Sequence, residues 1–468
     1  MLQKKPKKLT IYHHALLLFL AVGSLLYGIV ALDLPTAIAL ITSGSIAMGL
    51  CLLWGVGWQK IEENLFASIH AMLTPILILM CVGMMVGIWL LSGTIPSMVS
   101  IGLKSLSPSF FLIVACLSCS VMSVMAGTSW GTLSTIGVAL MGVALGLGIP
   151  PAYAAGAIVT GTFFGDKLSP LSDTTVMASA VCGVNIITHI KHMLYTTMPP
   201  YLLALALYLW LGSDIATNTN IVSNDASQIV MSLNDNFNLS LFTLAPPLAV
   251  FACILLRKPV LPSFFVGIVT GILVALIFQG SSLSQMGTAL SSGYKADTGF
   301  SMVDEMLSRG GLQSMMSTVA VLIAAAILGT PFKSAGTLDA AVQLLARRNA
   351  GKKKVLGGSM ALHSVAFLLT GSYYVTFSLL GPLLRPLVES SGSDARNLSR
   401  ILEDTGTTLS PLVPWGVTGA FTAATLGVAT ADFFIYAVLC YMTIIFSFFY
   451  VISGVTLVDA DADSATRR

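Results

Sequence analysis

The sequence predicts an all-α polytopic membrane protein, built from two inverted-topology repeats with discontinuous helices or re-entrant hairpins and about 10–13 membrane segments. Of its 468 residues, 55% are hydrophobic and 9% are charged, whereas soluble domains average about 25% charged residues. Mean hydropathy is +0.88. Besides this composition, two observations support the prediction: the chain has a series of long apolar runs, and two dense polar islands lie inside them. The sequence has no basic face interleaved with aromatic residues, which is the pattern that would indicate nucleic-acid binding.

The apolar runs predict the individual membrane helices. In the first half we expect helices at 11–31, 36–57, 72–92, 109–126, 130–149 and 194–211, and in the second half at 241–256, 260–279, 316–330, 355–373, 374–388 and 432–453. Residues 151–181 and 408–429 are apolar but are interrupted by Gly, Pro and polar residues, which is typical of broken or re-entrant helices. Residues 95–106 and 334–348 indicate interfacial amphipathic helices.

The distribution of Lys and Arg predicts the orientation. The first apolar run follows a lysine-rich N-terminus, is long enough to cross and lacks a signal-peptide cleavage pattern, so we expect a membrane helix with a cytoplasmic N-terminus. Segment 213–240 contains three Asp and no Lys or Arg, which indicates an external linker. The residues that we expect on the inner side are Lys4, Lys5, Lys7, Lys8, Arg257, Lys258, Arg347, Arg348, Lys352, Lys353, Lys354, Arg467 and Arg468.

Short sequence matches indicate an internal repeat. Segment 127–132 aligns with 371–376, which lies 244 positions later, and Ser-Pro-Leu recurs at 169–171 and 410–412. The loop charges orient the two copies oppositely. The predicted division is therefore a first transmembrane repeat at 1–212, an external linker at 213–240, a second, inverted repeat at 241–453 and a cytoplasmic tail at 454–468.

The first polar island, residues 165–175, has two carboxylates, one ammonium and four hydroxyls. Pro170 removes a backbone donor and breaks the helix, which is tolerated at membrane depth only beside a cavity. Carboxylate, hydroxyl and carbonyl oxygens suit a small hard cation such as Na⁺. A carboxylate that binds this cation and a proton in turn produces exchange. The charged candidates are Asp166 and Asp173, and the neutral oxygens are those of Ser169, Ser172, Thr174 and Thr175.

Simpler roles remain open for this island. Its hydroxyls and carboxylates could cap two half-helices, although two buried carboxylates exceed what capping needs. Lys167 could pair with Asp166 when the site is empty, or it could lie at the membrane surface.

The second island, residues 402–412, is chemically different from the first. Asp404 is a candidate for a direct role, and Glu403 is a weaker one, since both could instead cap a helix near the surface. Thr408 and Ser410 could line the same cavity. By the Ser-Pro-Leu match, whose two copies lie 241 positions apart, the positions aligned with Asp166 and Asp173 are Thr407 and Pro414.

Segment 127–131 has the form G-x-S-x-G, so an intramembrane serine hydrolase that uses Ser129 is a remote alternative. That motif needs a preceding strand, whereas the flanks here predict membrane helices. Thr128 and Ser129 therefore fit better as oxygen ligands at the cavity. The seven cysteines lie in apolar runs and indicate packing residues.

Three of the six histidines are candidates for a role in proton transfer or pH sensing. His189 and His192 fit a solvated helix end, with a pH sensor as the alternative. His363 lies in an apolar helix and is a candidate proton relay.

The segments 127–132 (GTSWGT), 164–175 (FGDKLSPLSDTT) and 402–415 (LEDTGTTLSPLVPW) resemble those of the NhaC-type Na⁺/H⁺ antiporters of bacteria, and the resemblance covers essentially the whole chain. It implies a secondary transporter rather than an enzyme, which moves Na⁺ out and H⁺ in across the cytoplasmic membrane. Together with the chemistry of the first island, this leads us to expect Na⁺ at Asp166 and Asp173. The resemblance also implies membership of the ion-transporter superfamily, with inverted repeats and an elevator-like motion. We expect no cofactor, and a homodimer is compatible with the sequence.

The same resemblance leaves the transported solute open. Close relatives include malate–lactate antiporters, so a Na⁺- or H⁺-coupled organic-acid or amino-acid exchanger is the alternative. Family members typically continue after the Trp with Asn-Thr-Cys-Gly, whereas residues 416–419 here are Gly-Val-Thr-Gly.

Overall fold

The protein is helical throughout the described parts of the chain. The structure, a computed structural model, describes residues 9–218, 222–346 and 351–460. Within these ranges the only β-type contact is an isolated bridge between Ser393 and Asp459. The all-α prediction is confirmed. The lysines at 4–8 and the arginines at 347, 348, 467 and 468 lie outside the described residues.

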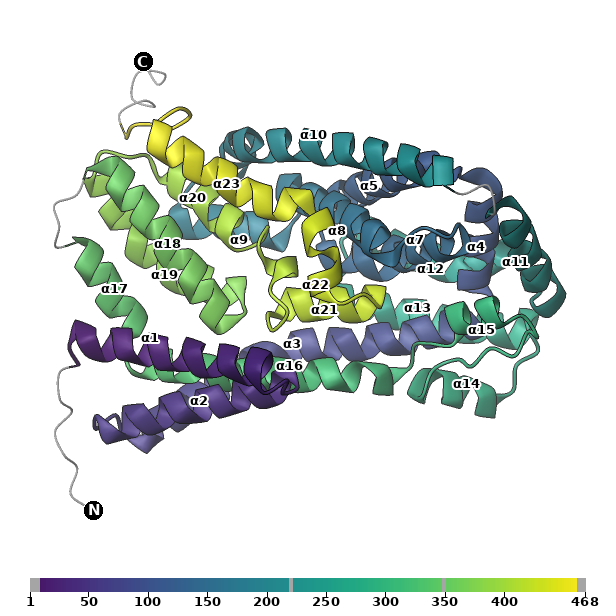
Figure 1. Ribbon diagram of the computed structural model, residues 1–468, viewed down its shortest axis with the longest axis horizontal. Helices are drawn as coiled ribbons and strands as arrows, with labels where there is room; N and C mark the ends of the chain where they lie inside the picture. The colour runs from purple at the N-terminus through teal and green to yellow at the C-terminus, as the bar shows by residue number, and fades with distance from the viewer. Residues whose placement is uncertain (1–8, 219–221, 347–350, 461–468) are drawn as a thin grey trace.

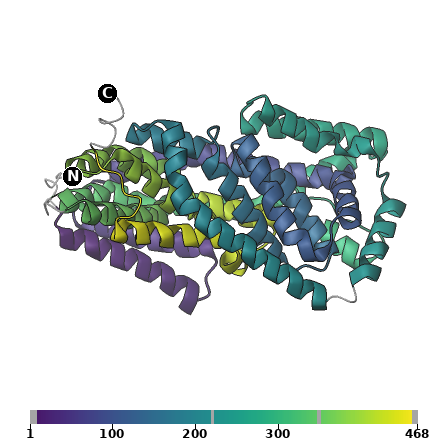
Figure 2. The same ribbon diagram turned by 90° about the horizontal axis from the view of Figure 1, so that it is seen from above.

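The helices form a long bundle (Figure 1), and a view turned by 90° shows α10 lying along one face (Figure 2). Among the described residues, eight helices are long and apolar enough to cross a membrane, or up to ten if two strongly bent pairs each count as one span. The chain is thus a multi-pass membrane protein, at the lower end of the predicted number of segments. Three more helices, α8 (Pro151–Leu168), α18 (Lys352–Thr370) and α19 (Tyr373–Ser390), have crossing length but a more polar composition.

The elements of the first half keep the predicted order. They are α1 (Ile11–Leu26), α2 (Thr36–Leu53), α3 (Trp58–Leu91), α4 (Thr94–Ser105), α5 (Pro108–Ala126), α6 (Ser129–Thr132), the π-turn η2 (Leu133–Gly137), α7 (Val138–Gly146), α8, α9 (Asp173–Cys182), α10 (Ile186–Asn218) and α11 (Val222–Asn236).

The second half continues after a short 3₁₀ turn. It contains α12 (Ala245–Leu255), α13 (Val260–Phe278), α14 (Leu283–Ser291), α15 (Ser301–Leu307), α16 (Met316–Ser334), α17 (Thr337–Ala346), α18, α19, α20 (Ala395–Thr405), α21 (Val417–Leu426), α22 (Thr430–Phe433) and α23 (Val438–Ser453).

Several predicted helix boundaries are wrong, because they were placed where the apolar runs of the sequence begin and end. Helix α3 begins at Trp58 rather than 72, and α10 spans 186–218 rather than 194–211, because a helix continues into polar residues that a hydropathy scan excludes. Much of the segment expected as a linker, 213–240, is helical. The last predicted helix, 432–453, is interrupted at Ala437, and α23 begins only at Val438. A separate bend of 91° lies before this segment, between Leu426 and Thr430.

Helix boundaries recur at a constant spacing. Helices α5 and α18 begin and end 244 positions apart, as do α9 and α21, and α8 and α20 begin 244 positions apart. The repeat that was visible in short sequence matches therefore also holds for the boundaries of whole helices. That the two halves are inverted repeats stays a prediction.

In each half a glycine allows a helix end to pack against a chain break. Gly127 ends α5 with φ 63°, and a Cβ there would lie 2.5 Å from the Leu171 Cβ. Gly371 ends α18 with φ 64°, and a Cβ there would lie 3.1 Å from the Trp415 carbonyl oxygen. Leu171 and Trp415 are also 244 positions apart. Left-handed backbone and close contact together favour glycine at both positions.

The two halves are interlocked rather than side by side. Helix α9 of the first half packs against α19 and α20, in a buried cluster that also includes residues of α18 (Figure 1). Conversely, α21 of the second half packs against η2, and Trp130 of the preceding α6 stacks on Phe421 of α21 with ring centroids 4.3 Å apart. Each broken segment therefore has its second helix in contact with the other half.

We expect Gly127→Ala to lower the melting temperature of the purified protein more than Gly280→Ala does. Both glycines have positive φ, 63° and 62°, but a Cβ at Gly280 meets nothing within 4 Å. Conformational strain of about 1–2 kcal/mol is common to both, and overpacking adds roughly 1–3 kcal/mol only at Gly127. Size-exclusion chromatography after heating measures the difference, and equal melting temperatures would contradict the proposed packing.

Candidate ion-binding site

The first chain break connects α8 to α9 through residues 169–172. The Ser169 hydroxyl donates to the Val124 carbonyl at 2.7 Å, and its oxygen accepts from the Leu171 amide at 3.3 Å. The Thr175 hydroxyl contacts the carbonyls of Asp166 at 3.3 Å and Lys167 at 3.2 Å, which satisfies the end of α8. Ser169 and Thr175 thus stabilise the backbone of the break.

Asp166 lies at the centre of the polar groups of the break. Its side chain is buried, and its Oδ1 accepts from the Ser172 hydroxyl at 2.9 Å. Ser172 also shares a 2.9 Å hydrogen bond with the Thr174 hydroxyl, and Ser129 interacts with the Asp166 carboxylate. The Asp166 Oδ2 has no hydrogen-bond partner. Four of the predicted site residues therefore come together around one open carboxylate oxygen.

Asp173 lies at the rim of this group. The residue is exposed, its Oδ1 accepts from the Thr174 amide at 2.9 Å, and its Oδ2 accepts from the Tyr374 hydroxyl. Tyr374 belongs to α19, so Asp173 connects the first break to the second half. Asp173 interacts electrostatically with Asp166.

Lys167 does not pair with Asp166 or reach a surface, so both interpretations of it are wrong. Its buried ammonium forms an ion pair with Asp404 of α20. The Thr196 hydroxyl of α10 donates to the same Asp404 oxygen at 3.0 Å. The two polar islands are thus directly joined, which the 237 residues between these partners concealed.

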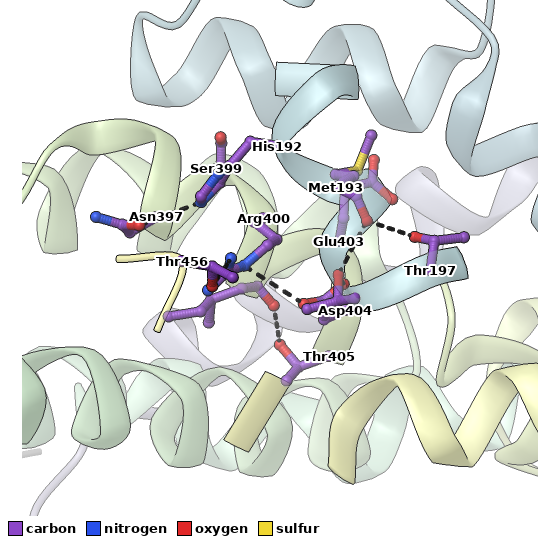
Figure 3. A network of polar contacts seen from close by, with 12 residues as sticks. His192, Met193, Thr197, Asn397, Ser399, Arg400, Glu403, Asp404, Thr405 and Thr456 are labelled. Carbon is purple, nitrogen blue, oxygen red and sulfur yellow. Dashed lines mark hydrogen bonds and ion pairs between the residues drawn. The ribbon is translucent and has the colours of Figure 1, made fainter. Parts of the chain in front are cut away.

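The acidic pair of the second island is buried, so its interpretation as a surface cap is wrong. Glu403 and Asp404 lie in the last turn of α20 and are fully buried, while Asp394 caps the start of that helix. Arg400, one turn before Asp404, approaches its Oδ2 at 4.0 Å and donates to the Thr456 hydroxyl at 2.9 Å. Figure 3 shows Arg400, Glu403 and Asp404 together beside α10. Arg400 is a site residue that hydropathy and motif matching missed.

The remaining predicted hydroxyls stabilise turns. Thr408 donates to the Glu403 carbonyl at 3.1 Å, and Ser410 donates to the Thr407 carbonyl at 2.7 Å. Thr128 caps α6 by accepting from the Gly131 amide at 3.4 Å. The Thr407 hydroxyl, in contrast, is buried without a partner.

The histidines surround α20. His363 is buried, and its Nδ1 lies 2.7 Å from the Thr405 hydroxyl. The expectation of a solvated helix end for His189 and His192 is wrong, because α10 packs on α20 and buries both. Their contacts are Ser399 at 2.8 Å and Asn397 at 3.1 Å, and Figure 3 shows the second.

The structure does not support a nucleophile elbow at Ser129. The element before Ser129 is the helix α5, whereas that motif requires a strand. All seven cysteines are free. Across residues 9–218, 222–346 and 351–460, no group of three or more His, Cys, Asp or Glu side chains is placed to hold a metal ion.

Comparison with known proteins decides the family. The model of the Na⁺/H⁺ antiporter family matches residues 7–181 and 161–455. The chain belongs to this family. The Na⁺/H⁺ antiporter NhaC of Alkalihalophilus pseudofirmus is 36% identical over 447 residues, which cover 94% of this chain and 96% of the relative.

Two further members show the range of the family. The Na⁺/H⁺ antiporter NhaC of Bacillus subtilis is 35% identical over 84% of this chain and 86% of its own. The malate-2H⁺/Na⁺-lactate antiporter of the same organism is 32% identical over 91% of both chains. These relatives are named as transporters, and the chain belongs with them rather than with enzymes.

We expect Lys167→Met to destabilise the protein by about 3–5 kcal/mol, because it leaves a buried carboxylate at Asp404 incompletely compensated. Adding Asp404→Asn should recover part of this loss, since the double variant restores the charge balance. Lys352→Met is the control, because Lys352 and Asp459 form an exposed pair that contributes less than about 1 kcal/mol. Denaturant unfolding in detergent measures all three, and equal losses for the two lysine variants would contradict the buried ion pair.

Proposed function

We propose that this protein is a secondary antiporter that moves Na⁺ out of the cell and H⁺ into it across the bacterial cytoplasmic membrane, without a cofactor. The observation that carries the proposal is the buried Asp166 carboxylate, which has one oxygen free and lies among hydroxyls at a break between two helices. The kinship with two NhaC antiporters supports the choice of ions.

Asp166 can bind either ion, but not both at once. Its free oxygen and the hydroxyls of Ser129, Ser172 and Thr174 offer hard ligands to Na⁺, whereas a proton neutralises the carboxylate directly. An uncompensated carboxylate is costly inside the membrane. Movement of the site is therefore favourable only with one of the two ions bound, and exchange follows from this restriction.

Asp173 is suited to a role at the entrance. It is exposed and interacts electrostatically with Asp166, so its negative charge attracts cations toward the deeper carboxylate. The hydrogen bond from Tyr374 orients it. We assign Asp166 to ion binding and Asp173 to ion entry, with direct coordination by Asp173 as its alternative role.

We also propose the membrane arrangement predicted above, with inverted repeats at 1–212 and 241–453, an external linker and a cytoplasmic tail. The constant 244-residue spacing of helix boundaries supports the repeat. Among the described residues, Lys352 and Lys353 contact the end of the chain through Asp459 and the carbonyls of Ile452 and Ser453. This contact supports the same side for the lysine cluster and the C-terminal tail.

Replacing Asp166 by Asn should abolish Na⁺-dependent proton movement, because an amide carries no charge to exchange. The measurement uses everted vesicles from an antiporter-deficient strain and a fluorescent pH probe, with Na⁺ added after acidification. Asp432→Asn is the matched control, since Asp432 is exposed on the short helix α22. Full exchange by the Asp166 variant at normal membrane abundance would exclude Asp166 from the site.

An organic-acid or amino-acid exchanger is the second candidate, and the kinship with a malate–lactate antiporter favours it. A transported carboxylate needs a cation or an amide to hold it. Lys167 is taken by Asp404, but Arg309 lies beside Gly427 with buried Nε and Nη2 atoms that have no partner.

The same vesicles separate the two candidates. We expect Na⁺ alone to dissipate the pH gradient, with no further effect of malate, lactate or an amino acid. A response that appears only when one of these solutes is present would support the second candidate and would make Arg309→Gln the next variant to measure.

A further inference from the structure

The two polar islands together bury five ionisable side chains. These are Asp166, Lys167, Arg400, Glu403 and Asp404, all at most 1% exposed. When ionised, three carboxylates and two cationic groups leave the cluster with one net negative charge. Because a net charge is unfavourable inside a membrane, one monovalent cation or one proton would neutralise the cluster.

The ion pairs are distributed unevenly within this cluster. Both cationic groups, Lys167 and Arg400, are directed to Asp404. Within the described parts of the chain, Asp166 and Glu403 have no ion-pair partner. Asp166 accepts one hydrogen bond from Ser172, whereas neither carboxylate oxygen of Glu403 accepts any. A fully buried carboxylate without a cationic partner is costly when it is ionised, so it favours a bound proton or a bound cation.

Glu403 lies on the side of α20 that faces the first break. It interacts electrostatically with Lys167, Asp166 and Asp404. Thr407, four residues later in the sequence, lies close enough to Glu403 to interact with its carboxylate as a hydrogen-bonding group, although its buried hydroxyl forms no hydrogen bond of regular geometry. The oxygens without a hydrogen-bond partner here are those of Glu403, the Thr407 hydroxyl, the Asp166 Oδ2 and the Asp404 Oδ2. Of these, the Asp404 Oδ2 faces a cation, the Arg400 guanidinium, at 4.0 Å.

We propose that Glu403 is a second carboxylate of the cation site, and that Glu403 and Asp166 together hold one small monovalent cation, with the Thr407 hydroxyl as a neutral ligand. This assignment rests on the proposed function. Each half of the chain then contributes one carboxylate. The Lys167–Asp404 ion pair holds the two carboxylates in one site without taking part in ion binding.

The test compares Glu403→Gln with Glu62→Gln, which removes an exposed carboxylate on α3. Na⁺-dependent proton movement gives the KM for Na⁺, and melting temperature with and without Na⁺ reports binding, since a ligand stabilises the folded state that binds it. We expect Glu403→Gln to raise the KM at least tenfold and to remove most of the stabilisation by Na⁺. Glu62→Gln should change neither.

A second readout distinguishes a ligand from a structural residue. Without Na⁺, Glu403→Gln should melt at the same temperature as the unchanged protein or higher, because it removes a buried carboxylate that forms no ion pair, while the amide can still accept from Thr407. If the Gln variant does not fold, Glu403→Asp keeps the charge but moves it by one methylene, and it should still raise the KM. An unchanged KM with normal stabilisation by Na⁺, in whichever variant folds, would overturn the assignment.

Failure of the proposed function has a different outcome. In that case the unchanged protein itself would show neither Na⁺-dependent proton movement nor stabilisation by Na⁺. Failure of the further inference alone would leave both properties present in the unchanged protein and equally present in the Glu403 variants.

Discussion

The ion pair between Lys167 and Asp404 is the constraint on which the site depends. Two charges that are fully buried in an apolar protein must compensate each other, since neither is stable alone. Their pairing brings the end of α8, on one side of the first break, to the last turn of α20, just before the second. It also leaves Asp166, the neighbour of Lys167, and Glu403, the neighbour of Asp404, near each other without cationic partners. The unfavourable placement of these carboxylates thus follows from the favourable pair beside them.

The breaks themselves depend on backbone geometry. A helix that ends inside a membrane protein exposes carbonyl and amide groups, which need partners within the protein. Ser169 and Thr175 supply them in the first break, and Thr408 and Ser410 supply them in the second. These hydroxyls were plausible cation ligands by sequence because they lie in the same islands. Their hydrogen bonds to backbone carbonyls give them a different task, which is to keep the break stable while Asp166 remains open.

The sequence predicted the class of fold, the order of the helices and the two breaks, because apolar runs and Pro-Gly interruptions are local signals. It also predicted Asp166 with the hydroxyls of Ser129, Ser172 and Thr174, since most of these residues share one short segment. It could not predict the partner of Lys167, or the burial of His189 and His192, because both depend on which helix packs beside α8 and α10. For the same reason, the sequence indicated Glu403 only as a weaker candidate for the site. An acidic residue near a predicted helix end suggests a cap, and only the position of α20 shows that this end is buried.

The unequal chemistry of the two halves is what makes a coupled site possible. Asp166 aligns with Thr407 by the Ser-Pro-Leu match and with Ser410 by the 244-residue spacing of the helices, so in either case the second half has a hydroxyl where the first half has a carboxylate. Its own carboxylate, Glu403, lies four residues before Thr407. A strictly symmetric pair of islands would bury two Asp-Lys pairs and would have no net charge to exchange. Replacing one aspartate and one lysine by uncharged residues and adding Glu403, Asp404 and Arg400 instead leaves a single negative charge at the interface of the halves. That charge requires one cation at a time, which is the condition for exchange.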